Sequence, residues 1–244
     1  MIGKINKNMY NERFVKNEYY NNIGDRIEKV VGLFGRNNDG KILDVGCGDG
    51  LISELIGKKT GAKIYGVDVA DAAVRLSRKR GIDAKIFDIN KKIPFKNAYF
   101  DAVYCGEVLE HVFDVDNLID EIKRVLKPKG YAIITVPNIA AWYNRGLMLL
   151  GYLPFWVEAS IKNPVGSPFA VSCGHVKAFT KSALVQLFHI HGFRAEAVKG
   201  AYINVKEVEN KASQRIAARI ISVVDRMFSR FPSLSTNIIL KAVK

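Results

Sequence analysis

Acidic residues and glycines alternate where one short apolar run of the chain ends. The run closes with Asp44 and Val45, and it is followed by Gly46, Gly48, Asp49 and Gly50. Glycine lets the backbone approach a ligand closely, and a helix that begins after such a turn offers N–H groups without helical partners. Two carboxylates here would repel a pyrophosphate, whereas they suit a ligand that carries an amino group. The segment therefore predicts a turn that binds a positively charged ligand.

The spacing of the glycines separates this turn from a dinucleotide site. Dinucleotide-binding turns carry Gly-x-Gly-x-x-Gly, whose third glycine lets the helix pack close to the strand. Here the spacing is Gly46-x-Gly48-x-Gly50, and Leu51 follows directly. A nicotinamide-dependent dehydrogenase is therefore the weakest of the enzyme hypotheses.

Runs with strand and helix periodicity alternate from residue 41 onward. Strands are expected at 41–45, 63–67, 84–87, 99–104, 131–136, 194–204 and 237–243, and helices at 51–58, 71–80, 117–126 and 180–191. This alternation predicts an α/β fold with a mainly parallel sheet and helices on both faces. Asp68 closes the second strand, where its carboxylate can accept hydrogen bonds from both hydroxyls of a ribose.

Taken in order, these motifs resemble those of the class I S-adenosylmethionine-dependent methyltransferases. The resemblance spans residues 40–200, and Glu107-Val-Leu-Glu-His111 is similar to the type 11 group with its ubiquinone-biosynthesis O-methyltransferase branch. The runs Leu118–Gly130 and Ile133–Asn138 match the same branch. The resemblance implies one Rossmann-like domain with a seven-stranded sheet, whose last strand runs antiparallel beside the preceding one. It also implies S-adenosylmethionine as the cofactor.

The predicted cofactor contacts fall at the ends of the expected strands. In chain order they are Asp44, Gly46, Cys47, Gly48, Asp68, Val69, Asp88, Ile89 and Cys105. The first four, with the backbone at Cys105, would face the methionine part, and Cys47 is expected to be a small turn residue rather than a nucleophile. The next two would hold the ribose and flank the adenine ring. The resemblance implies that Asp88 accepts from the adenine amine while the backbone of Ile89 donates.

Two histidines, His111 and His175, are the candidates for catalysis. Methyl transfer is an in-line displacement at a carbon that the sulfonium already activates, so the enzyme mainly aligns the reactants. A general base is needed when the acceptor must lose a proton with a high pKa. His111 could equally be a satisfied helix residue. His175 lies in Gly174–Thr180, which resembles the family's His-x-x-x-Phe-Thr element, and could instead anchor a lid.

Glu107, Glu110 and His111 form a second candidate set, of oxygen and nitrogen donors at helical spacing. At i, i+3 and i+4 they could share one helix face and hold a divalent ion, as in some relatives of the quinone branch. The alternative is a solvated helix start whose carboxylates favour the helix dipole. We expect the alternative, and therefore no metal.

Two segments lie around the expected sheet without belonging to it. Residues 1–38 end in helical spacing and are expected to form a helical cover, over the cofactor mouth or only over a sheet edge. Residues 139–173 hold an apolar stretch that Gly151 and Pro154 interrupt, too short to cross a bilayer. The resemblance implies that this insertion is a lid over the acceptor pocket, and its composition favours an apolar acceptor.

A third segment, 211–231, predicts an amphipathic helix. Its apolar face would hold Ile216, Ile220, Val223, Val224, Met227, Phe228 and Phe231, opposite Arg215, Arg219, Ser222, Arg226 and Arg230. Arginine opposite aliphatic and aromatic residues is typical of a helix that lies in a membrane interface. A helix docked on the protein's own sheet, with its arginines in water, has the same pattern and is the favoured interpretation.

Composition limits the remaining choices. The chain has 244 residues, enough for one domain with additions, and its formal net charge of +13 permits attraction to nucleic acid or anionic lipid without choosing between them. Three widely spaced cysteines fit neither a zinc site nor a disulfide framework, and the first residues hold no signal-peptide core. We therefore expect a cytoplasmic protein, with peripheral membrane contact through 211–231 as the alternative.

The expected reaction is methylation of a small-molecule or lipid-precursor acceptor, at oxygen. An RNA methyltransferase and a non-catalytic S-adenosylmethionine-binding protein are the alternatives. Nucleic acid is not the expected partner, because the sequence shows neither an Asn-Pro-Pro-Tyr-type element nor an appended RNA-binding module.

Overall fold

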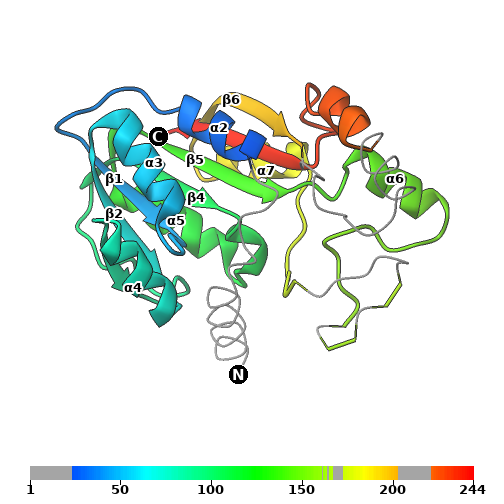
Figure 1. Ribbon diagram of the computed structural model, residues 1–244, viewed down its shortest axis with the longest axis horizontal. Helices are drawn as coiled ribbons and strands as arrows, with labels where there is room; N and C mark the ends of the chain where they lie inside the picture. Colours follow the sequence, from blue (N-terminus) through cyan, green and yellow to red (C-terminus); the bar gives the residue numbers. More distant parts are fainter. Residues whose placement is uncertain (1–23, 161, 164, 167–172, 203–220) are drawn as a thin grey trace.

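One seven-stranded sheet organises the part of the chain that the computed structural model describes, residues 24–160, 162–163, 165–166, 173–202 and 221–244 (Figure 1). Its strands are β1 Lys41–Val45, β2 Lys63–Asp68, β3 Asp83–Ile86, β4 Phe100–Gly106, β5 Leu126–Pro137, β6 Arg194–Ala201 and β7 Asn237–Val243. They lie in the order β3-β2-β1-β4-β5-β7-β6, and β7 runs antiparallel to both of its neighbours. The predicted Rossmann-like sheet, with its last strand antiparallel, is confirmed.

Helices cover both faces of this sheet. Those on the sheet are α2 Gly24–Gly32, α3 Leu51–Thr60, α4 Asp71–Lys79, α5 Val115–Val125 and α7 Lys181–Ile190, with a 3₁₀ turn η1 at Leu109–His111, whereas α6 Trp142–Leu149 lies beyond the end of the sheet (Figure 1). Val30, Ile56 and Val74, from the first three helices, pack together with Ile42 of β1. Leu43, the next residue of β1, belongs instead to the cluster under α5 and α7. Side chains alternate across a strand, so β1 contributes to both layers of the core.

Several element boundaries differ from the sequence-based prediction for local reasons. The side chain of Asp114 accepts from the Asn117 backbone N–H, so α5 begins two residues before the predicted start at 117. β5 is longer than 131–136, because its first residue, Leu126, pairs with Phe100. The side chain of Thr180 accepts from the Ala183 N–H and thereby caps α7.

The order of the strands reverses at β1, because β2 and β3 lie on one side of it and β4 and β5 lie on the other. β1 pairs in parallel with β2 on one side and with β4 on the other. In open α/β sheets a ligand binds beyond the carboxyl ends of the strands at such a switch point. The fold therefore brings the glycine turn after β1, Asp68 at the end of β2 and Gly106 at the end of β4 to one edge.

The C-terminal helix differs from its prediction. Residues 221–228 are helical, whereas 211–220, and residues 1–23 of the predicted N-terminal cover, lie outside the described part of the chain. Three residues that the prediction assigned to the docked face are exposed instead: Val223, Met227 and Phe231. The helix lies beside α6 rather than on the sheet, at the end of the molecule away from β3 and α4 (Figure 1).

A polar contact decides which face of this helix is buried. Asp225 is 3% exposed, and its carboxylate accepts from Trp142 Nε1 at 3.1 Å and from Thr236 Oγ1 at 2.8 Å. The ring of Phe228 stacks on that of Trp142, with centroids 5.6 Å apart. Since an unpaired buried carboxylate is costly, these bonds turn the Asp225 side inward and leave the opposite apolar stripe outside. Among the described residues, no helix combines the length and the apolar composition that crossing a bilayer requires.

Candidate functional site

The glycine turn after β1 has the close approach that its sequence predicts. Gly46 has a φ of 77°, and a Cβ at this position would lie 2.4 Å from Val108 Cγ2. The backbone N–H groups of Gly46 and Cys47 both donate to the Val67 carbonyl of β2. Any residue other than glycine at position 46 would meet both a left-handed backbone and a collision.

Asp44 is a buried carboxylate at the base of this turn. It is 2% exposed, Ser53 Oγ donates to its Oδ2, and its Oδ1 has no hydrogen-bond partner among the described residues. Burial raises the pKa of Asp44 to about 7, while the Ser53 bond lowers it. A carboxylate in this state suits a cation or an N–H donor, because such a partner would satisfy its second oxygen.

Asp68 holds the turn from the end of β2. Its Oδ2 accepts from the Gly48 backbone N–H at 2.9 Å, and its Oδ1 accepts from the Ala70 N–H at 2.8 Å. Burial raises the pKa of Asp68, against these backbone bonds, which lower it. Each carboxylate oxygen has a further lone pair, so the residue can position the turn and still accept from a ribose.

The predicted adenine contacts follow β3 and lie close to Asp68. The Phe87 backbone N–H donates to the Asp68 carbonyl at 2.8 Å. Asp88 is exposed and accepts from the backbone and side chain of Asn90, while Val69 and Ile89 are half-buried. The structure thus brings the ribose and adenine candidates to one stretch of the edge.

Two of the predicted residues are buried cysteines. Cys105 pairs in register with Val45, so its backbone lies next to the start of the glycine turn. Cys47 and Cys105 are both free thiols, and burial raises the pKa of each. A thiol with a raised pKa is a poor nucleophile, which agrees with a structural place for Cys47.

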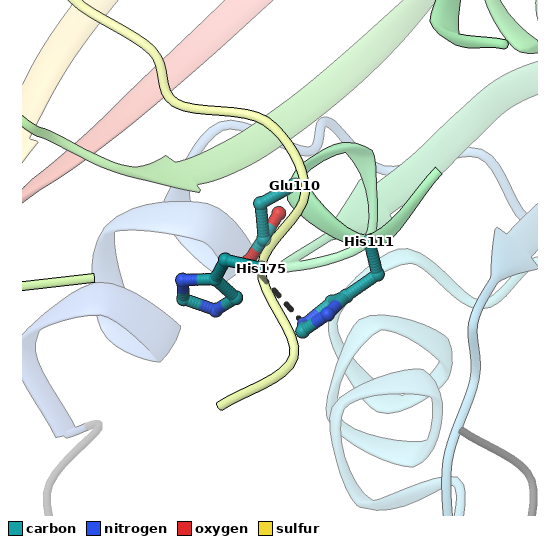
Figure 2. Close-up of side chains that lie close together, drawn as sticks. All are labelled: Glu110, His111 and His175. Atoms are coloured by element: carbon teal, nitrogen blue, oxygen red, sulfur yellow. Dashed lines mark ion pairs between the residues drawn. The ribbon is translucent and has the colours of Figure 1, made fainter. Parts of the chain in front are cut away.

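The two histidine candidates, 64 residues apart in the sequence, meet beyond the end of β4 (Figure 2). The rings of His111 and His175 lie edge to face, with centroids 4.7 Å apart. Nδ1 of His111 lies 3.1 Å from the Gly174 carbonyl oxygen, and Nδ1 of His175 lies 3.1 Å from that of Trp156. A carbonyl only accepts, so each Nδ1 carries a proton, and in the neutral form of each ring the lone pair lies on Nε2.

Glu110 completes this cluster. It is 2% exposed, its Oε1 lies 4.0 Å from His111 Nε2, and neither carboxylate oxygen has a hydrogen-bond partner among the described residues. Burial, helped by the nearby Glu107, raises the pKa of Glu110 well above its ordinary value. Its main-chain carbonyl accepts from the N–H groups of Val176 and Lys177, which ties η1 to the segment that carries His175.

Glu107, Glu110 and His111 do not share a helix face, and the favoured interpretation of a solvated helix start is wrong as well, because Glu110 is 2% exposed. Glu107 lies before η1 with a φ of 56°, so its side chain leaves in a different direction. The three groups that converge are Glu110, His111 and His175, with one ligand atom from each within 4.8 Å of the others. A carboxylate and two imidazoles are donors that could hold a divalent ion.

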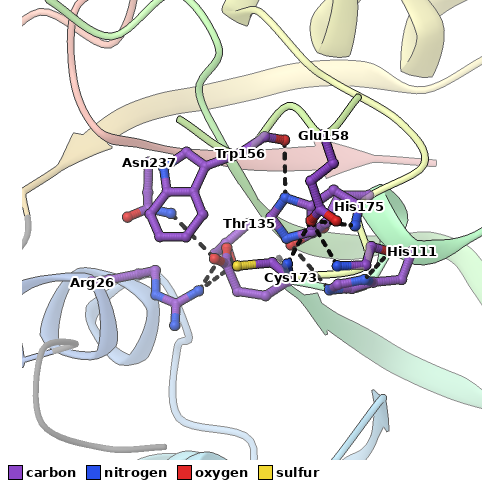
Figure 3. A network of polar contacts seen from close by, with 11 residues as sticks. Arg26, His111, Thr135, Trp156, Glu158, Cys173, His175 and Asn237 are labelled. Atoms are coloured by element: carbon purple, nitrogen blue, oxygen red, sulfur yellow. Dashed lines mark hydrogen bonds and ion pairs between the residues drawn. The ribbon is translucent and has the colours of Figure 1, made fainter. Parts of the chain in front are cut away.

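Glu107 instead belongs to a buried polar network that reaches α2 (Figure 3). Arg26 Nη1 lies 2.6 Å from its Oε1, and Thr135 Oγ1 donates to the same oxygen at 2.9 Å. Asn237 Nδ2 donates to Oε2 at 3.2 Å. Sequence reasoning missed Arg26, because an arginine in an amphipathic helix is ordinarily assigned to solvent.

Glu158, in the insertion that the sequence predicts to be a lid, holds the segment around His175 and was also missed. Its Oε1 accepts from three successive backbone N–H groups, at 2.5 Å from Cys173, 2.7 Å from Gly174 and 3.3 Å from His175 (Figure 3). A carboxylate that accepts several backbone bonds holds a turn firmly. Glu158 therefore positions His175, and no spacing in the sequence connects the two.

Comparison with known proteins agrees with the class of protein that this fold and glycine turn define, a Rossmann-like methyltransferase. A family model described as a methyltransferase domain matches residues 15–198, well over half of the chain. The ubiquinone biosynthesis O-methyltransferase of Idiomarina loihiensis is 30% identical over 186 residues, which cover 73% of each chain. The chain belongs to the class I S-adenosylmethionine-dependent methyltransferases, and S-adenosylmethionine is its cofactor.

Solved structures share the fold at low sequence identity. The methyltransferase in complex with the Trm112 activator from Haloferax volcanii gives a TM-score of 0.67 at 14% identity, over 96% of each chain. A methyltransferase from Thermotoga maritima gives a TM-score of 0.61 at 17% identity, over 100% of this chain and 98% of the other. Likeness at these identities concerns the fold, and acceptors differ freely among proteins that share one.

Proposed function

We propose that this methyltransferase acts on an oxygen atom of a small-molecule or lipid-precursor acceptor. The observation that carries the proposal is the pair of imidazoles of His111 and His175, 4.7 Å apart beyond the end of β4. A hydroxyl must lose its proton as it becomes a methyl ether, and a neutral imidazole is suited to accept that proton near pH 7. The name of the Idiomarina relative, an O-methyltransferase, supports transfer to oxygen.

In this proposal the residues that would hold the cofactor lie along the edge from β4 to β3. Asp44 would accept a hydrogen bond from the amino group of the methionine part. The turn at Gly46 and Gly48 would let the protein backbone contact the same part of the cofactor. Asp68 accepts from the ribose hydroxyls while it holds the turn. The half-buried Val69 and Ile89, with Asp88, take the adenine.

The proton then follows a short route. Bound S-adenosylmethionine would supply an activated methyl carbon, and its carbon–sulfur bond would break as the acceptor oxygen bonds to that carbon, so that the sulfur would lose its positive charge. The acceptor proton passes to Nε2 of His175 or His111, and the resulting imidazolium lies beside Glu110. A nearby carboxyl that can ionise stabilises such a cation. Glu158 keeps His175 in place during this step.

A divalent ion is the alternative use of the same cluster. Glu110, His111 and His175 would hold it once the carboxyl is ionised, and it would lower the pKa of a bound acceptor hydroxyl. The two uses differ in one measurement. If the cluster is a general base, the enzyme keeps its methyl-transfer activity after treatment with a chelator. Loss of this activity on chelation, with recovery on added Mg²⁺, would assign the cluster to a metal.

The lid favours an acceptor with an apolar or aromatic part. Phe155 and Trp156 lie next to each other, and the Trp156 ring centroid is 5.9 Å from that of His175. Aromatic side chains beside a reacting group bind apolar rings and exclude water. We further propose a cytoplasmic enzyme that meets such an acceptor at a membrane surface.

The experiment is transfer of labelled methyl groups to fractionated acceptors. The full chain is incubated with labelled S-adenosylmethionine in three separate reactions, which contain hydroxylated aromatic compounds, lipid extracts or RNA. Label in a base-stable, organic-soluble product supports the proposal. Label in RNA instead would favour the RNA methyltransferase alternative, and binding of S-adenosylhomocysteine without any transfer would favour the non-catalytic one.

A further inference from the structure

α6 and the C-terminal helix lie at one end of the molecule (Figure 1), and both of these segments carry exposed apolar side chains. Leu149 is 88% exposed, Leu150 74% and Met227 63%. Three further exposed residues of the same two segments complete what we name the apolar end patch: Leu149, Leu150, Tyr152, Val223, Met227 and Phe231. Single exposed apolar residues are ordinary, but a group of this kind marks an interaction site.

The patch has two parts, and hydrogen bonds join them into one unit. The Trp142 backbone N–H at the start of α6 donates to the Leu234 carbonyl at 3.0 Å. Arg145 Nη2 donates to the Ser233 carbonyl at 3.3 Å. The Trp142–Phe228 stack lies between the same two elements. α6 and the C-terminal helix are therefore held side by side, and both leave apolar side chains exposed.

The outward stripe of the C-terminal helix cannot be buried by a small rotation. Val223 and Met227 are spaced i and i+4, which places them on one side of the helix, and the exposed Phe231 follows three residues after the helix ends. Asp225 and Ser229 hold the other side inward. Rotation would break the bonds of Asp225 to Trp142 and Thr236 and would expose apolar surface elsewhere.

The charge around the patch has one sign. Within residues 142–157 and 221–236 the exposed charged side chains are Arg145, Arg226 and Arg230. The acid in these ranges, Asp225, is buried. Arginines beside an outward aliphatic and aromatic stripe are complementary to anionic headgroups over an acyl layer.

We propose that the apolar end patch is a docking surface for an anionic lipid bilayer. A second copy of the chain fits less well, since two surfaces with the same arginines would repel each other. A bilayer accepts both features at once, because the leucines and Phe231 enter the boundary of the acyl layer while the arginines meet phosphates.

Aromatic contacts connect this surface with the catalytic histidines. Starting from Phe228, successive ring centroids lie 5.6, 5.6, 5.5, 6.3 and 5.9 Å apart, through Trp142, Tyr143, Phe155 and Trp156 to His175. A docked patch would thus place the lid against the bilayer, so that a lipid-like acceptor could pass from the acyl layer toward the site. This last step rests on the proposed function, whereas docking itself does not.

The test is co-sedimentation of the full chain with vesicles of phosphatidylcholine, with and without phosphatidylglycerol. The parent chain should bind the anionic vesicles and lose binding as salt is raised. Leu149→Ser with Leu150→Ser should weaken partitioning about tenfold, because two leucines no longer enter the acyl boundary. Arg226→Glu with Arg230→Glu should weaken binding to the anionic vesicles specifically.

Matched controls use residues far from the patch. Ile190→Ser removes an apolar side chain of similar exposure on α7, and Arg75→Glu with Lys79→Glu inverts two exposed charges on α4. Both controls should bind as the parent does, and unchanged affinity for S-adenosylhomocysteine in all variants shows that they fold. The proposal would be overturned if the parent chain did not bind anionic vesicles, or if the α4 control lost as much binding as the patch variants. It would also be overturned if the parent chain were a dimer in solution and only the patch variants were monomers. Failure to methylate any lipid with vesicle binding intact would instead count against a lipid-like acceptor alone and would leave the docking surface in place.

Discussion

The cofactor edge and the acceptor side of this site are built in different ways. At the cofactor edge, the contacts join residues that are near in sequence, such as Asp44 with Ser53 and Gly48 with Asp68. On the acceptor side, Glu107 binds Arg26 and Asn237, which lie at opposite ends of the described chain. A short motif can encode the first arrangement, whereas the second exists only once the sheet has formed.

The largest expected effect separates the two regions. His175→Ala should lower kcat by about 10²–10⁴-fold, since it removes a general base or its close neighbour. Affinity for S-adenosylhomocysteine, measured by calorimetry, should stay within about twofold because the cofactor edge is untouched. His189→Ala, an exposed histidine on α7, is the control. A parallel loss of cofactor affinity would show that the two regions are not independent.

The second prediction concerns the network that ties α2 to the acceptor side. Arg26→Met removes the cation that pairs with the partly buried Glu107 carboxylate. Because that carboxylate then loses its ion pair, the free energy of unfolding should fall by about 3 kcal/mol. Urea denaturation measures the change. Adding Glu107→Gln should recover part of the loss, because the unpaired charge is then removed. Equal stability of the single and double variants would mean that the ion pair is not what holds α2.

A smaller effect is expected at the glycine turn. Gly46→Ala places a methyl group against Val108 at a φ of 77°, and should cost about 1–3 kcal/mol of stability. Cofactor affinity should fall as well, because the turn must shift. Combining it with Val108→Ala relieves the collision but not the backbone strain, so recovery should be partial. Full recovery would show that only the collision matters.

The smallest predicted effect is a pH dependence of the cofactor edge. Burial raises the pKa of Asp44 from 3.8 to about 7, so its contribution to apo-protein stability is fully present below about pH 4 and is lost as pH rises through 7. Cofactor binding should have the opposite sign, because the amino group needs the ionised carboxylate. Affinity for S-adenosylhomocysteine should fall about tenfold from pH 8 to pH 6. Calorimetry on Asp44→Asn should show weak binding that does not change over this range.

Much of the sheet and of the cofactor edge could be predicted, for reasons that particular residues show. Ile42, Leu43 and Val45 make a strand that is buried on both faces, and the chain turns at the glycines that follow it. Such patterns are local, and the fold did not override them. The C-terminal helix was predicted with the wrong face inward, because hydrophobic periodicity cannot show that Asp225 would find Trp142 and Thr236.

The sequence alone determined the class of fold, the methyl donor, and the two histidines that could accept a proton. The class of fold follows from residue types at short spacing, where backbone geometry leaves few alternatives, whereas the methyl donor and the histidine candidates follow from the resemblance of the motifs to the class I methyltransferases. Tertiary structure decided that His111 and His175 meet, that Glu107 pairs with Arg26, and that the apolar stripe on the last helix faces outward. Each of these depends on contacts between distant segments, and it is the assembled sheet that brings such segments together.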